Sequence, residues 1–266
     1  MISTAFSIIA AISYGLGSFF QRQNLTRDNE DRRKVIACGI FAVLTHLGVI
    51  ILIIPQPQGL DFGFFKVASL ISWVVVVTVL LSSWKKPLEN LFLYLFPLAI
   101  ICLLASILVP SSYTPQGEYS TGVAVHIMLG ILAVSVITIA AFQALLISFL
   151  DGLLKSKKSF SLVSHLPPLE TMEALLFEVL WMGLLLLTGV LVTGVLFMED
   201  FFGQHLSHKT VLSTISWVVF SILLWGRHQL GWRGKKANRW IIAGFAFLLL
   251  AYFGSKFVLE ILLDRI

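Results

Sequence analysis

Charged residues are scarce in this sequence. They make up 12% of the 266 residues, whereas a soluble domain of ordinary composition carries about 25%. Those present lie between long apolar runs, and the mean hydropathy is +0.92. This composition excludes an ordinary soluble domain and predicts a membrane protein with several spans. The net charge of +5 needs no nucleic-acid partner to explain it.

Cysteines and catalytic motifs are scarce as well. Cys38 and Cys102 lie inside apolar runs and lack C-x-x-C spacing. They indicate neither a disulfide framework nor a zinc site, and we expect them to pack as small apolar residues. The sequence contains no Gly-rich phosphate loop, nucleophile elbow or H-E-x-x-H motif. We therefore expect a binding or assembly protein rather than an enzyme.

Long apolar runs are what the sequence does contain. Eight of them can cross about 30 Å of hydrocarbon at about 1.5 Å per residue. Each should be an α-helix, because backbone groups in lipid must be satisfied within the segment. The first run lacks the basic flank and cleavage site of a signal peptide, so we expect a retained span. The predicted fold is all-α, a single integral membrane domain over residues 1–266. Its predicted spans cover residues 2–21, 35–54, 64–83, 91–110, 121–149, 173–197, 211–226 and 240–262.

Basic residues gather in the loops on one side of these spans. Of the 19 Lys and Arg residues, 15 fall on that side, and the others are Lys66, Lys209, Lys256 and Arg265. The positive-inside rule makes the basic side cytoplasmic. We therefore expect both chain termini on the outer, periplasmic side of a bacterial inner membrane.

Four of the six histidines gather toward the predicted outer side. His46 lies past the midpoint of the second span, and His126 lies near the outer end of the fifth. His205 and His208 lie in the outer loop between spans six and seven. This grouping depends only on the topology, so it tolerates errors of a few residues in the span boundaries.

Imidazole is a frequent protein ligand for heme iron and for several transition metals. A bis-histidine heme site in a bundle needs one histidine from each of two facing helices, and His46 and His126 lie at similar predicted depths. Each could instead hydrogen-bond to a neighbouring helix, although ionisable groups inside a membrane are functional candidates by default. If helical, His205 and His208 share a face and could bind a metal or heme. Histidines in surface loops are more often simply solvated.

Three blocks, in order within residues 125–245, resemble one family. Residues 125–147, VHIMLGILAVSVITIAAFQALLI, resemble the V-H segment of the CcsA-like cytochrome c assembly proteins. Residues 165–194, which include LPPLETME and TGVLVTG, are similar to a second segment of these proteins. Residues 208–245, which include GWRGKK, are similar to a third. The likeness is greatest to the shorter HemX-like and YpjD-like inner-membrane proteins of this family.

The resemblance implies an eight-helix membrane protein that binds heme b in cytochrome c maturation or heme homeostasis. It gives His126 the role of an axial ligand, with His46 as the first candidate partner and His205 or His208 as the alternative. The family's tryptophan-rich W-x-W-D motif is missing, since the sequence before Lys209 reads FFGQHLSH. A second outer ligand near the end of the last span is missing as well. We therefore expect a heme-handling accessory protein without synthase activity, whose partners are the lipid bilayer, heme and proteins of cytochrome assembly or the heme pathway.

Two other classes of function stay open. A divalent-metal transporter or efflux accessory would use Asp200, His205 and His208 as an outer entry site. Against it, spans two to five lack the midplane carboxylates that cation transporters usually hold. A membrane scaffold or regulator with a vestigial heme site would instead dock a soluble partner on the basic cytoplasmic face near Arg233 and Lys235.

Overall fold

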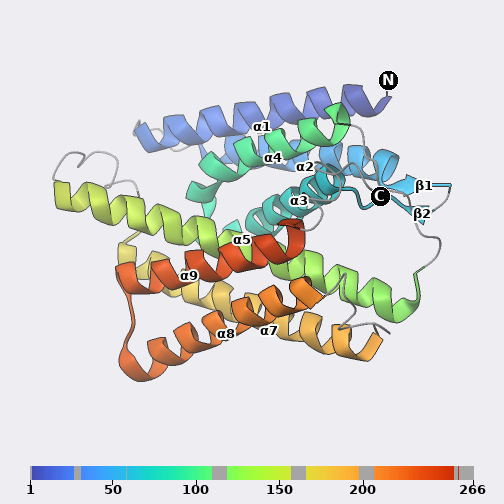
Figure 1. Ribbon diagram of the computed structural model, residues 1–266. Coiled ribbons are helices and arrows are strands. Elements are labelled where there is room, and N and C mark those ends of the chain that lie inside the picture. The colour runs from blue at the N-terminus through green and yellow to red at the C-terminus, as the bar shows by residue number, and fades with distance from the viewer. Residues whose placement is uncertain are drawn as a thin grey trace. The chain divides into compact units, whose positions relative to one another are not determined.

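The computed structural model describes residues 2–26, 31–57, 59–109, 119–156, 166–197, 207–254 and 257. Among these residues, eight helices are long and apolar enough to cross a membrane, which confirms the predicted all-α polytopic fold (Figure 1). The chain divides into two compact units. The first contains residues 1–117, 157–167 and 263–266, and the second contains residues 118–156 and 168–262. The expectation of one integral membrane domain stays a prediction.

Four α-helices lie in the part of the first unit that the structure describes. They are α1 (Ile2–Thr26), α2 (Arg32–Ile53), α3 (Phe64–Ser83) and α4 (Phe92–Leu108), with the short 3₁₀-helix η1 (Glu89–Leu91) leading into α4. Each helix packs against the next one in the chain, and α4 packs back against α1. Ala10, Val49 and Leu103, from three of these helices, are fully buried against one another. The unit is therefore a closed four-helix bundle with an apolar centre.

A short antiparallel hairpin, β1 (Pro55–Gln56) and β2 (Gly59–Leu60), connects α2 to α3. After it, the buried carboxylate of Asp61 accepts a hydrogen bond from the backbone N–H of Gly63 at 2.9 Å. The same carboxylate forms an ion pair with Lys66 in the first turn of α3. Asp61 thus ties the hairpin to the start of α3, where a negative charge is favourable.

The described residues of the second unit repeat the closed arrangement with four other α-helices. They are α5 (Thr121–Ser156), α7 (Leu169–Phe197), α8 (Ser207–Leu230) and α9 (Gly234–Leu249), and the π-helix η2 (Leu250–Gly254) continues α9. Helix α5 packs on α7, α7 on α8 and α8 on α9, and α9 packs back on α5. Each of these four contacts also holds a polar side-chain bond. The bonds are Gln143 Nε2 to Met172 O (3.3 Å), Trp217 Nε1 to Thr188 Oγ1 (2.9 Å), Ser216 Oγ to Gly244 O (2.9 Å) and Asn238 Nδ2 to Ser148 Oγ (2.8 Å).

The structure differs from the predicted spans mainly at helix ends. Helix α5 has 36 residues, or about 54 Å at 1.5 Å per residue, so it extends beyond the thickness of a bilayer. The predicted span of residues 121–149 is already longer than a bilayer requires. Helix α8 begins at Ser207 and α9 at Gly234, before the predicted starts at 211 and 240. Both early turns are polar, and polar residues extend a helix without extending an apolar run. Of the predicted end of the last span, residues 255, 256 and 258–262 lie outside the described residues.

Small residues let α5 and α7 approach closely. A Cβ atom at Gly183 of α7 would lie 2.7 Å from Cγ1 of Ile137 on α5. Ala140 and Ala141 of α5 are fully buried. Helices in lipid associate through such packing and through interhelical hydrogen bonds, because lipid tails are as apolar as the side chains they would replace. Gly183, Ala140 and Ala141 thus allow the close approach of α5 and α7.

We expect Gly183→Ala to destabilise the second unit, although alanine has the higher helix propensity. Its methyl group would enter the space that Ile137 fills, and overpacking of this kind costs about 1–3 kcal/mol. Thermal unfolding of the purified protein in detergent measures the change. The matched control is Gly152→Ala on α5, where a Cβ atom meets nothing within 4 Å. An equal change in Tm for the two variants would contradict the packing role of Gly183.

Candidate functional site

His126 lies in the second turn of α5 and is half-buried. Its Nδ1 atom is 3.1 Å from Oγ1 of Thr193 on α7. The imidazole is therefore held against the neighbouring helix through one of its two nitrogens.

Glycines lie one turn before and one turn after His126 on the same face of α5. A Cβ atom at Gly122 would lie 2.4 Å from the ring of Phe197, and one at Gly130 would lie 3.6 Å from the ring of Tyr252. Two aromatic rings from α7 and η2 thus occupy the space that α5 side chains would take. The imidazole has an apolar, aromatic neighbourhood along its helix.

The surface of α5 beside His126 is apolar and exposed. Val125 is 42% exposed and Met128 63% exposed, on either side of the histidine along the chain. A histidine that is hydrogen-bonded through one nitrogen can bind a metal ion or heme iron through the other. The donor and its surroundings therefore fit an apolar macrocycle with an iron centre.

His46 has a different environment in the first unit. It is fully buried, with Nδ1 3.2 Å from Oη of Tyr14 on α1 and Nε2 2.9 Å from Oγ of Ser69 on α3. These contacts are the helix-to-helix hydrogen bonds that the sequence left open as the alternative to ligation. To bind iron, His46 would have to give up one of them. Its pairing with His126 of the second unit stays a prediction.

The loop histidines are only partly described. His208 is exposed in the first turn of α8, so it is helical. His205 and Asp200 lie outside the described residues, and the predicted His205–His208 face stays a prediction. Among the described residues, no group of three or more His, Cys, Asp or Glu side chains is placed to hold a metal ion.

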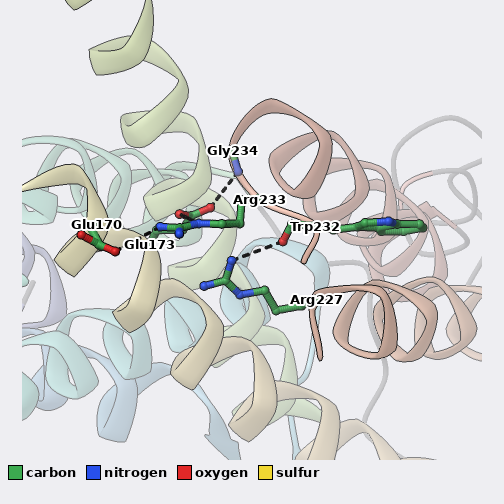
Figure 2. Close-up of polar contacts among 6 residues, drawn as sticks. All are labelled: Glu170, Glu173, Arg227, Trp232, Arg233 and Gly234. Atoms are coloured by element: carbon green, nitrogen blue, oxygen red, sulfur yellow. Dashed lines mark hydrogen bonds and ion pairs between the residues drawn. The ribbon is translucent and has the colours of Figure 1, made fainter. Parts of the chain in front are cut away.

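A second polar cluster lies at the other end of the second unit (Figure 2). The buried carboxylate of Glu173, on α7, accepts a hydrogen bond from Nε of Arg233 at 3.0 Å through Oε2. Its Oε1 accepts one from the backbone N–H of Gly234 at 2.7 Å. Glu170 lies 3.5 Å from Arg233 and is largely exposed. These carboxylates raise the pKa of the Arg233 guanidinium above its ordinary value, with the hydrogen bond to Glu173 as the largest cause.

The turn between α8 and α9 explains the GWRGKK segment. Gly231 has φ +63° and Gly234 has φ +56°, a conformation that only glycine adopts readily. The guanidinium of Arg227 donates a hydrogen bond to the carbonyl of Trp232 at 3.5 Å (Figure 2). The ammonium of Lys236 lies 3.6 Å from the Trp232 ring centroid, a cation–π contact. Both glycines are thus required by the backbone of the turn.

Sequence reasoning missed the contact between Glu173 and this turn. It placed Glu173 near the inner end of a span and treated Arg233 as part of a basic face. The signal that could have revealed the contact is a carboxylate at the end of an apolar helix, because such a group needs a partner.

A cavity of about 470 Å³ lies beside the cluster, lined among others by Lys155, Asn238 and Lys235.

These features define the class: a polytopic membrane protein of helical bundles, with a half-buried histidine in one of its spans. The chain belongs to the cytochrome C assembly protein family, whose sequence profile matches residues 35–263. This confirms the resemblance found in the three sequence blocks.

Several proteins are similar to this chain. The inner membrane protein YpjD of Escherichia coli K12 is 31% identical over 262 residues, which are 97% of this chain and 98% of that protein. Protein HemX of Brevibacillus brevis is 22% identical, over 94% of this chain and 93% of its own length. The cytochrome c biogenesis protein CcsA of Prochlorococcus marinus is 32% identical over 87 residues, 32% of this chain and 28% of that protein. No solved structure matches the chain significantly.

We expect Glu173→Gln to lower the Tm on the order of 5 °C, because it weakens two hydrogen bonds to a buried carboxylate. Thermal unfolding in detergent checks this. The control is Glu170→Gln, which removes an exposed and longer ion pair and should leave the Tm almost unchanged. If both variants shift the Tm equally, Glu173 does not anchor the turn.

Proposed function

We propose that this protein is a heme-handling accessory protein of the inner membrane, acting in cytochrome c maturation or heme homeostasis. It binds heme b without forming a covalent bond to it, and it does not catalyse attachment of heme to a cytochrome. His126 is the axial ligand. The family supports the link to cytochrome assembly, and the YpjD relative supports the inner membrane.

The observation that carries this proposal is the placement of His126. It is a half-buried imidazole in an apolar span, held by one nitrogen on Thr193 and flanked by glycines at which aromatic rings pack. When bound, heme would supply a redox-active iron. The chain supplies the nitrogen donor, the apolar contacts and the orientation of the ring.

The second axial ligand comes from another histidine of the chain. His46 stays the first predicted partner, although both of its nitrogens are within hydrogen-bond distance of hydroxyl groups. His208, exposed at the start of α8, and His205 are the alternatives. A protein with one strong axial ligand and an exchangeable second one suits a role in transient heme binding.

The sequence before Lys209 supports a role without synthase activity. It reads FFGQHLSH, with neither the tryptophans nor the aspartate of the family's heme-presenting motif. The proposed orientation keeps both chain termini periplasmic, by the positive-inside rule. Candidate partners are proteins of cytochrome assembly or of the heme pathway.

We expect His126→Ala to abolish stoichiometric heme binding, because it removes the nitrogen that bonds the iron. The measurement is the reduced absorption spectrum of protein purified in detergent with heme supplied, together with heme per chain. The control is His228→Ala, which removes an exposed histidine at the end of α8 and should leave the spectrum unchanged. Wild-type protein without b-type bands would overturn the proposal.

A third variant, His46→Ala, separates the two interpretations of His46. If it is an axial ligand, the variant shifts the heme spectrum while His208→Ala does not. If it only joins helices, the variant keeps the wild-type spectrum and unfolds at a lower temperature, since Tyr14 and Ser69 lose a buried partner. The contacts in the structure favour the second result.

A further inference from the structure

We propose that Thr193 is a positioning residue that sets which nitrogen of His126 carries the proton. It holds the neutral ring as the Nδ1–H tautomer, so that Nε2 presents a lone pair to an incoming metal centre. Its consequence for heme binding rests on the proposed function, whereas the hydrogen bonds that set the tautomer are present without heme.

The Thr193 hydroxyl has a single proton to donate. Oγ1 lies 2.7 Å from the carbonyl oxygen of Gly189, one turn earlier on α7, and 3.2 Å from that of Val190. Carbonyl oxygens only accept, so the hydroxyl donates its proton within its own helix. Its lone pairs remain for the third neighbour, Nδ1 of His126, at 3.1 Å.

The donors and acceptors around Thr193 determine which nitrogen of His126 is protonated. Because the hydroxyl proton is already used, the bond between Thr193 and His126 requires a hydrogen on Nδ1. A neutral imidazole carries one proton, so Nε2 is unprotonated. A histidine side chain in water favours the opposite tautomer, Nε2–H.

The tautomer determines which nitrogen of His126 can bind a metal centre. A metal centre bonds the unprotonated nitrogen, and a hydrogen bond from the other nitrogen orients the ring and raises its basicity. Thr193 would thus prepare His126 before any ligand arrives. His46 provides the contrast within the same chain. Its two nitrogens face the hydroxyls of Tyr14 and Ser69, which can each donate or accept, so its contacts do not select a tautomer in the same way.

The tautomer can be measured directly in the heme-free protein. We suggest labelling histidine with ¹⁵N and recording nitrogen chemical shifts at pH 8, above the ordinary pKa of imidazole of about 6.5. The shifts distinguish Nδ1–H from Nε2–H, and the His126→Ala variant assigns the signal. We expect Nδ1–H for His126 in the wild type and in Thr193→Ser, which keeps the hydroxyl. Thr193→Val, which keeps the shape, should move the ring to Nε2–H.

The matched control is Thr188→Val on the same helix. Thr188 also donates within α7, at 2.8 Å to the carbonyl of Leu184, but it accepts from Nε1 of Trp217 rather than from His126. The Thr188→Val variant should therefore leave the His126 tautomer unchanged. With heme supplied, Thr193→Val should bind heme about 10–100-fold more weakly than the wild type, and Thr193→Ser should restore the affinity.

Two results would overturn the inference: a wild-type His126 in the Nε2–H form, or a Thr193→Val variant that keeps Nδ1–H. Failure of the proposed function looks different. In that case the tautomers follow the expected pattern, but the wild-type protein binds no heme. A protein that binds heme through His126 with an affinity independent of position 193 would leave the function standing and remove the role of Thr193.

Discussion

The close contact between α5 and α7 is the constraint on which the rest of the second unit depends. It exists because Gly183 faces Ile137 where a larger side chain would not fit, and because the alanines of α5 are small. Across the same contact, Thr193 reaches His126 and Gln143 reaches the carbonyl of Met172. In lipid, where burial of apolar surface favours no particular partner, packing and such bonds decide which helices associate.

Helix α7 anchors two different features near its two ends. Toward its C-terminal end, Thr193 holds the candidate ligand of α5. In its first turns, Glu173 holds Arg233 and the start of α9, where the negative charge also faces the positive end of a helix dipole. The GWRGKK turn therefore has a structural explanation in its glycines and its carboxylate partner. This explanation requires no partner protein on the basic face.

The sequence was sufficient for the number of spans, their helical nature and the long extension of α5, because lipid leaves the backbone few alternatives. It also singled out His126 and, through its motifs, the family. It could not show that His46 lies between two hydroxyls from other helices, since contacts between helices depend on rotation and depth that apolar runs do not encode. The same limit hid the bonds of Glu173 to a turn some sixty residues away. The polar first turns of α8 and α9 were missed because the spans were predicted from apolar runs, and these runs begin only after the polar turns.

The central claim is that a nitrogen of His126 bonds heme iron. Pulsed electron paramagnetic resonance of the ferric, heme-loaded protein tests it most directly, with histidine labelled by ¹⁵N. We expect strongly coupled histidine nitrogens in the wild type and in His228→Ala. Any heme that His126→Ala retains should lack one of these couplings. A heme-loaded wild type without histidine coupling, or a His126→Ala variant whose heme keeps every histidine coupling of the wild type, would contradict it.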